Sequence, residues 1–164
     1  MNWIFRSQRI GKDGRIFEML KFRTLKENKG ITTFAQQEEY TWCGRFLRKT
    51  KIDELPQLLN WLKRDINIVG PRAEEVKTVR IIPLGIRAKL FSVRPGLTSL
   101  ASIHYFDEGQ ILGKSDDPHK IYWKQIKPVK IMLDCFYVDN HDIFLDAWII
   151  FKTAWIIIKS FFRK

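Results

Sequence analysis

The stretch LRKTKIDELPQLLNWLKRDINIVGPR, residues 47–72, joins a basic segment to a predicted helix and then to a short apolar run that ends in a turn. Residues 54–63 are predicted to be helical because leucines recur at i, i+3, i+4 and i+7. These leucines are Leu55, Leu58, Leu59 and Leu62. Pro56 fits the first helical turn, where its missing N–H costs no helical hydrogen bond. The pattern therefore places Asp53 and Glu54 at the start of this helix.

The acids Asp53 and Glu54 follow four cations: Arg45, Arg48, Lys49 and Lys51. The helix dipole and these cations are expected to favour the ionised form of Asp53. An ionised aspartate can bind Mg²⁺ or attack phosphorus. Ordinary helix capping explains the same two acids, and this segment alone favours capping.

The end of the stretch, Ile68 to Arg72, is an apolar run that turns at Gly70-Pro71 into a helix predicted from Ala73. Backbone N–H groups at such a turn bind anions, and an arginine can clamp a phosphate bidentately. A plain connection between a strand and a helix explains the pattern equally well.

The flanking segments indicate an α+β fold in a single domain, with a small N-terminal hairpin and several helices. Residues 3–10 and 15–24 are predicted strands around the turn GKDG, and Lys21 shares a face with Arg23. Residues 25–40 and 107–120 are predicted loops, and residues 97–106 a further strand. Helical segments are predicted at residues 41–49, 83–91, 128–137 and 143–162.

The last predicted helix is strongly amphipathic. Lys152, Lys159 and Arg163 share one face, and tryptophan, isoleucine and phenylalanine crowd the rest. Such a helix suits a membrane interface, although a core helix with one wet stripe has a similar pattern. It is interrupted by charges, and no segment reaches the roughly 18 apolar residues of a spanning helix.

The net charge of +11 calls for an anionic partner: nucleic acid, anionic lipid or a phosphorylated substrate. The two cysteines, Cys43 and Cys135, lie far apart and in no metal-ligand spacing. We expect two buried thiols rather than a disulfide or a zinc site.

Two further acids, Asp134 and Asp146, lie in aromatic-rich stretches. A carboxylate among apolar neighbours needs a partner if it is buried. Asp146 could therefore be a metal ligand or a member of a structural ion pair with an arginine.

Read in order, four segments resemble the bacterial sugar transferase family, the monotopic phosphoglycosyl transferases. They are QRIGKDGRIFEMLKFRT (8–24), residues 47–72, VRPGLTSLAS (93–102) and LDCFYVDNHDIFLDAWIIFKT (133–153). The resemblance covers about residues 5–160, and the spacing of DELPQ and VGPR is its most specific part.

The resemblance implies that Asp53 attacks the β-phosphorus of a UDP-sugar, expels UMP and forms a phosphosugar aspartyl ester. A polyprenyl (undecaprenyl) phosphate then takes the sugar phosphate, which begins synthesis of a lipid-linked glycan. It also implies Mg²⁺ at Asp53 and Glu54, with a catalytic role for both. Substrate binding is implied for Arg72, Arg48, Lys21, Asp134 and Asp146.

The sequence departs from the family in two places. Family members carry a hydrophobic re-entrant helix before the segment that begins here at Gln8, so residues 1–164 are expected to be the catalytic domain without that anchor. The run after Arg94-Pro95-Gly96 differs from the commonest GxAQVNGR-like version, which bears on the choice of sugar or nucleotide.

The expected location is the cytoplasmic face of the bacterial inner membrane, against an anionic surface. Two rival functions remain at this point: an inactive, truncated relative that serves as a membrane-surface scaffold, and a basic nucleic-acid-binding domain. No recognition signature for nucleic acid is present, so such a partner is not expected. The sequence leaves the oligomeric state open.

Overall fold

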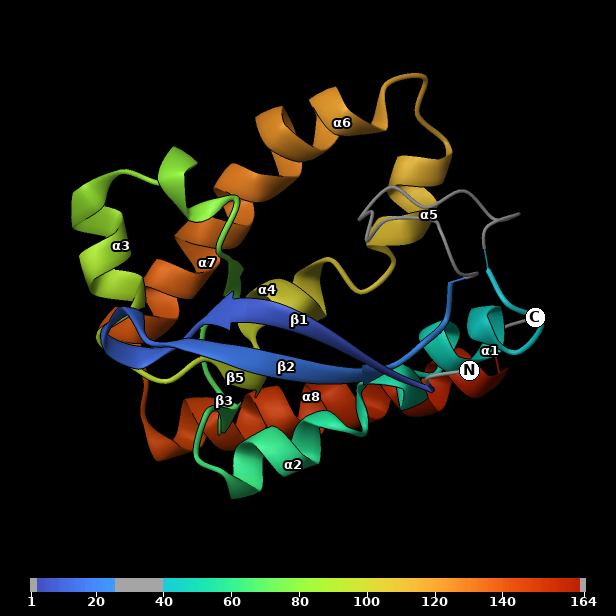
Figure 1. Ribbon diagram of the computed structural model, residues 1–164, viewed down its shortest axis with the longest axis horizontal. Coiled ribbons are helices and arrows are strands. Elements are labelled where there is room, and N and C mark those ends of the chain that lie inside the picture. Colours follow the sequence, from blue (N-terminus) through green and yellow to red (C-terminus); the bar gives the residue numbers. More distant parts are fainter. Residues whose placement is uncertain (1–2, 26–39, 163–164) are drawn as a thin grey trace.

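The computed structural model describes residues 3–25 and 40–162 and shows an α+β fold, as the sequence predicts (Figure 1). The N-terminal hairpin consists of β1 (Ile4–Ile10) and β2 (Ile16–Phe22). The strands pair from Ile4↔Phe22 to Ile10↔Ile16, which confirms the predicted hairpin. A further strand, β4 (Glu74–Glu75), joins the free edge of β1 and gives the order β2-β1-β4.

The inward face of β2 turns from apolar to charged along the strand. Phe17 and Met19 are buried and pack with Ile66 and Ala73. Because side chains alternate along a strand, Lys21 lies on this same inward face. The hairpin therefore aims a cation into the molecule.

Two short strands, β3 (Asn67–Val69) and β5 (Gly96–Thr98), pair in parallel. Their backbones approach so closely that a Cβ on Gly96 would lie 2.2 Å from the backbone nitrogen of Gly70. A Cβ on Gly70 would lie 2.6 Å from the carbonyl oxygen of Arg94. Only glycine fits at both positions, and this close contact fixes the turn that carries Arg72.

The helices predicted in segments 41–49, 83–91, 128–137 and 143–162 are confirmed as α1 (Gly44–Lys49), α3 (Leu84–Leu90), α7 (Lys127–Asn140) and α8 (Ile143–Phe162). A second core cluster joins Val69, Tyr137 and Ile149, from β3, α7 and α8. No helix within the described ranges is both long and apolar enough to cross a membrane.

The helix predicted over residues 54–63 is shorter than expected. Pro56 is the residue before α2 (Gln57–Leu62), and Asp53 and Glu54 lie in a separate 3-10 turn, η3 (Ile52–Glu54). The leucine face of this segment is exposed, whereas Gln57 and Asn60 are buried. The amide of Asn60 ties the helix to β2, since it accepts from the N–H of Leu20 and donates to the carbonyl of Glu18.

Three other predictions of secondary structure were wrong: the helix from Ala73, the strand over residues 97–106 and the loop over residues 107–120. No helix begins at Ala73, because the chain there joins β1 as strand β4. Residues 97–106 form only the end of β5 and then α4 (Leu100–His104), because the hydroxyl of Ser99 caps a helix by accepting from the N–H of Ser102.

The predicted loop over residues 107–120 contains α5 (Glu108–Gly113) and the start of α6 (Pro118–Ile121), whose N-cap is Asp117. A π-helical turn, η5 (Tyr122–Ile126), leads from α6 into α7. The loop predicted over residues 25–40 falls mostly outside the described residues, as does Arg163.

Candidate active site

A small pocket lies where the hairpin, the η3 turn and the segment after β3 meet. Its polar lining comes from Arg9, Lys21, Glu54, Gln57, Arg72 and Ser102. Three of the residues predicted for the site, Lys21, Glu54 and Arg72, therefore line one cavity although they are far apart in sequence.

Asp53 is buried directly beside this pocket, in the η3 turn. Lys51, the residue before the η3 turn, has a left-handed backbone with φ 60°, an uncommon conformation for a residue with a side chain. The Oδ1 atom of Asp53 is buried and accepts no hydrogen bond from the described residues. Buried polar atoms in proteins nearly always have a hydrogen-bond partner, and a ligand bound at Asp53 would provide the missing one.

Burial raises the pKa of Asp53, and the neighbouring Glu54 raises it further. The cations Lys21, Lys51 and Arg48 oppose this shift without overcoming it. The sequence expectation that the cations dominate was therefore wrong, because it took no account of burial. A carboxylate that is poorly hydrated in this way is a stronger base and a better nucleophile.

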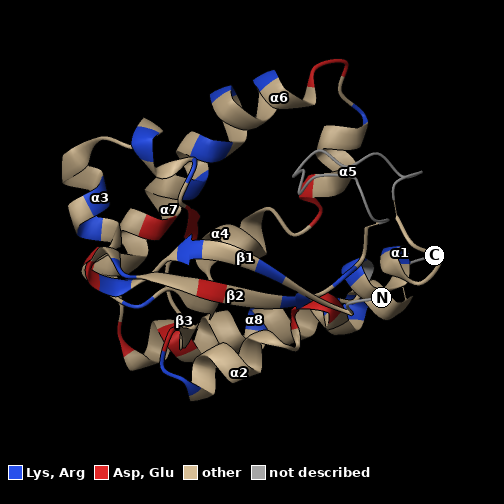
Figure 2. Cartoon of the chain, in the orientation of Figure 1, with Lys and Arg blue, Asp and Glu red and all other residues tan. Residues whose placement is uncertain are grey.

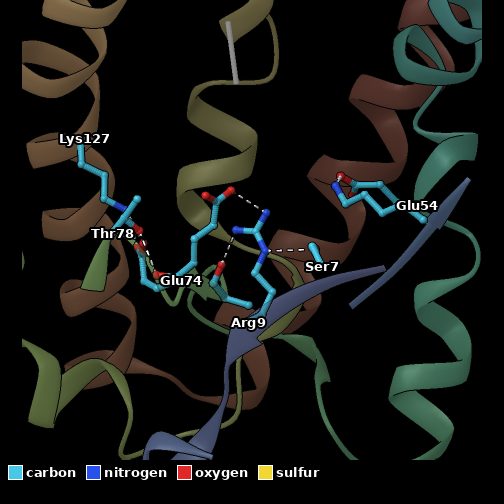
Figure 3. Close-up of polar contacts among 9 residues, drawn as sticks. Ser7, Arg9, Glu54, Glu74, Thr78 and Lys127 are labelled. Atoms are coloured by element: carbon cyan, nitrogen blue, oxygen red, sulfur yellow. Dashed lines mark hydrogen bonds and ion pairs between the residues drawn. The ribbon is translucent and has the colours of Figure 1, made fainter. Parts of the chain in front are cut away.

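Glu54 forms an ion pair with Lys21, whose Nζ lies 2.7 Å from Oε1 (Figure 3). Burial alone would raise the pKa of Glu54, but Lys21, Lys51 and Arg72 together bring it well below its usual range. Burial lowers the pKa of Lys21, and Glu54 opposes that change. Glu54 thus remains ionised beside Asp53.

Arg72 lines the pocket and remains open to solvent. Burial would lower the pKa of Arg72, but Glu54, Glu108 and Tyr122 raise it above its ordinary value. Its backbone N–H donates to Oδ2 of Asp134 over 3.2 Å. The side chain therefore offers a fixed positive charge to an anion in the pocket.

Arg48 lies near enough to Asp53 to lower its pKa, and its guanidinium donates to the hydroxyl of Tyr40. Asp134 is buried on α7, and its contact is with the backbone of the Arg72 turn. Asp146 on α8 accepts from the hydroxyl of Tyr137 over 2.7 Å. The structure thus gathers a group made of Asp53, Glu54, Lys21, Arg72 and Arg48. Asp134 contacts the Arg72 turn and Asp146 contacts Tyr137, and the Oδ1 atom of Asp134, like that of Asp53, is buried without a hydrogen bond from the described residues.

Sequence reasoning missed a second group of charges next to the pocket (Figure 3). Arg9 pairs with Glu75, and Lys127 pairs with Glu74. Lys130 pairs with Glu108 and lies over the rings of Tyr105 and Tyr122. Burial and then the neighbouring Arg72 lower the pKa of Lys130 to about 8, although Glu108 opposes the shift. These lysines occupy helix positions without any local motif, so no pattern in the sequence identified them.

The residues present fit a magnesium ion that is shared with a phosphorylated ligand. Within the described ranges, no group of three His, Cys, Asp or Glu side chains could hold a metal alone. Mg²⁺ is usually bound by one or two carboxylates together with substrate phosphates, and the free Oδ1 of Asp53 is such a ligand.

The cysteines Cys43 and Cys135 are free thiols, and both are half-buried rather than fully buried.

A buried carboxylate beside a lysine and an arginine is an arrangement that phosphoryl chemistry uses. Comparison with known proteins gives the class more narrowly. The chain belongs to the bacterial sugar transferase family, whose model matches residues 1–160.

Three relatives illustrate the range of the family. The chain is 37% identical over 150 residues to an uncharacterised sugar transferase, EpsL, of Bacillus subtilis strain 168, covering 88% of this chain and 64% of EpsL. It is 33% identical over 154 residues to a UDP-N-acetylgalactosamine-undecaprenyl-phosphate N-acetylgalactosaminephosphotransferase of Aeromonas hydrophila, covering 89% of this chain and 33% of the relative.

The third relative is a UDP-glucose:undecaprenyl-phosphate glucose-1-phosphate transferase of Escherichia coli K12. It is 40% identical over 108 residues, which are 62% of this chain and 23% of the relative. The chain therefore spans between about a quarter and about two thirds of the length of these relatives.

Proposed function

We propose that this protein transfers a sugar phosphate from a UDP-sugar to undecaprenyl phosphate, through a covalent ester on Asp53. The observation that carries the proposal is the buried, unbonded Oδ1 of Asp53 beside the pocket that Lys21, Glu54 and Arg72 line. The names of the relatives from A. hydrophila and E. coli support the donor and acceptor classes.

In the first half of the reaction, an oxygen of Asp53 attacks the β-phosphorus of the donor. A bond forms between this oxygen and phosphorus, and the bond from phosphorus to the bridging oxygen breaks. UMP leaves with that electron pair. Arg72 and Lys21 stabilise the negative charge that spreads over the phosphoryl oxygens.

In the second half, a phosphate oxygen of undecaprenyl phosphate attacks the same phosphorus. The ester bond to Asp53 breaks, the carboxylate is restored, and an undecaprenyl diphosphosugar is released. Because the attacking phosphate is already ionised, no strong general base is needed. Glu54 holds Lys21 in place through their ion pair.

Mg²⁺ bound at Asp53, with Glu54 nearby, would neutralise charge on the donor diphosphate. Arg48 lowers the pKa of Asp53 and so helps to keep it ionised for attack. Asp134 holds the turn that carries Arg72.

A lipid substrate also accounts for the exposed apolar side chains on α1, α2 and α8. These helices lie in the lower part of Figure 1, and α1 meets α8 through Phe46 and Phe161. On α8, Phe151 is 64% and Trp155 57% exposed, and Trp42, shortly before α1, is 97% exposed. Basic residues beside exposed tryptophans suit an anionic membrane surface, and we place the protein at the cytoplasmic face of the bacterial inner membrane.

The direct test is release of UMP from a panel of UDP-sugars, with Mg²⁺ and undecaprenyl phosphate in detergent. We expect release from at least one donor, and Asp53→Asn should reduce it at least about 10⁴-fold, as when a covalent nucleophile is removed. The control is Asp116→Asn, an exposed acid shortly before α6 that does not line the pocket.

The same assay separates the rival functions. A folded wild-type protein that releases no UMP from any donor would support a non-catalytic scaffold. A shift of random DNA that weakens with salt, without UMP release, would support a nucleic-acid-binding domain.

A further inference from the structure

The segment that carries Arg72 has little regular structure of its own. Pro71 has no N–H to donate, and β4 pairs with β1 only at Ile10↔Glu74 and Arg9↔Glu75. The N–H of Gly96 donates to the carbonyl of Pro71 over 2.9 Å, so backbone contacts hold the turn as far as Pro71. From Arg72 to Glu74, side chains of other elements add the contacts that orient the segment.

Three such contacts hold the segment. Oδ2 of Asp134 accepts from the backbone N–H of Arg72, and Nη1 of Arg9 donates to the carbonyl of Ala73 over 3.2 Å. The carboxylate of Glu74 accepts from Nζ of Lys127 at both of its oxygens, each over 2.5 Å (Figure 3). The turn is thus tied to β1 on one side and to α7 on the other.

The pair of Glu74 and Lys127 is the most deeply buried of these contacts, with both side chains only 9% exposed. A buried ion pair adds little net stability compared with apolar residues of similar size, because both charges lose their hydration. Losing one partner is costly, since the other charge is left uncompensated. Such a pair is therefore better suited to fixing a geometry than to stabilising the fold.

Building on the proposed function, we propose that Glu74 and Lys127 are positioning residues that hold the turn after β3 so that Arg72 faces the Asp53 site. Lys127 is not among the described residues that line the pocket, whereas Arg72 and Arg9 are. Its ammonium group is occupied by the two oxygens of Glu74. Lys127 therefore acts through Arg72 rather than on the substrate.

The first test is a double-mutant cycle on UMP release. Lys127→Met should lower kcat/KM by about 10- to 100-fold, since small misplacement of a distant group has effects of this size. In an Arg72→Met background, the same change should cost less than about twofold, because the group that it positions is already gone. Lys127→Arg, which can still bond both oxygens of Glu74, should retain most of the activity.

The matched control is Lys124→Met, an exposed lysine one turn earlier on the same helical run. It should leave kcat/KM unchanged. Equal losses from Lys127→Met in the wild-type and Arg72→Met backgrounds would overturn the proposal, because they would mean that Lys127 acts independently of Arg72.

The second test does not depend on activity. Hydrogen–deuterium exchange at the Arg72 amide should become about tenfold faster or more in Lys127→Met, while amides in the β1–β2 hairpin keep their rates. Unchanged exchange at Arg72 would overturn the positioning role, whether or not the protein releases UMP. Absence of UMP release from the wild type, with faster exchange in the variant, would instead contradict only the proposed function.

If Lys127→Met fails to fold, the exchange measurement is made on the double variant Glu74→Gln, Lys127→Met. This variant leaves neither charge uncompensated in the interior. The expected and contradicting results at the Arg72 amide are the same.

Discussion

The pocket side of this protein buries charge, whereas the outer faces of α1, α2 and α8 expose apolar side chains. Around the pocket, Asp53, Glu74, Lys127 and Asp134 are all buried. On α8, Trp148, Phe151 and Trp155 are exposed, and Figure 2 shows that α2 and α8 carry few charges. Both regions depart from the usual rule that charges face water and apolar groups avoid it.

The two departures have different physical causes. Buried charges persist where they are paired or where they serve a ligand. Exposed apolar surface of this extent marks a contact with a lipid or a protein. α2 shows the difference within one helix, because the polar residues Gln57 and Asn60 face inward while the leucines face out. The comparison agrees with the proposed function, in which a catalytic pocket lies next to a lipid-facing surface.

The largest effect on activity is expected when charge is removed from the pocket. Arg72→Met should lower kcat for UMP release by about 10²- to 10³-fold, as when one preorganised donor to a developing charge is lost. Binding to vesicles should not change. The control is Arg80→Met, an exposed arginine outside the pocket. A variant that loses vesicle binding along with activity would contradict the separation of the two regions.

A smaller effect is expected when charge is added to the apolar surface. Trp155→Asp should weaken flotation with phosphatidylglycerol vesicles about tenfold, since one large side chain no longer enters the interface. UMP release from soluble donor in detergent should remain within about twofold of wild type. Leu84→Asp is the matched control, because Leu84 is 77% exposed but lies on α3. Equal losses from both variants would contradict a specific lipid-facing surface.

The smallest effect concerns the pH dependence of stability. Burial raises the pKa of Asp134 to about 7, and Glu74 contributes, while the N–H of Arg72 opposes the shift. Between the ordinary aspartate range and pH 7, the folded protein holds a proton that the unfolded chain has lost, so stability falls as pH rises through this window.

Asp134→Asn removes this titration while keeping an acceptor for the Arg72 amide. The Tm of the variant relative to wild type should therefore rise between pH 5 and pH 8, by about 2–4 °C for each kcal/mol of relieved penalty. Thermal unfolding at several pH values provides the measurement. A Tm difference that is constant or falls with pH would show that Asp134 does not titrate in this way.

Much of the fold follows from local signals. The hairpin around GKDG, α7 and α8 were predicted because turn residues and apolar periodicity are strong there. The strand predicted over residues 97–106 was wrong, because the hydroxyl of Ser99 caps the N-terminus of a helix, α4, in the middle of that segment. The helix predicted from Ala73 was wrong because pairing with β1, a contact distant in sequence, determines the conformation there.

The residues of the candidate site likewise fall into two groups: those within a local sequence motif and those outside any motif. Asp53, Glu54 and Arg72 belong to sequence motifs, so the resemblance to a family identified them. Arg9, Lys127 and Lys130 have no motif, and only the folded chain places them beside the pocket. The raised pKa of Asp53 could not be predicted from the sequence, because it comes mainly from the burial of Asp53. That burial depends on the packing of the hairpin against the η3 turn.

The most direct test of the central claim is the intact mass of the protein after mixing with its UDP-sugar and Mg²⁺, without any lipid acceptor. We predict that the mass of one sugar phosphate is added, that the added group maps to Asp53, and that undecaprenyl phosphate removes it. Asp53→Asn should show no such addition. Turnover in the presence of acceptor without an adduct, under conditions that preserve acyl phosphates, or an adduct on another residue, would contradict the account.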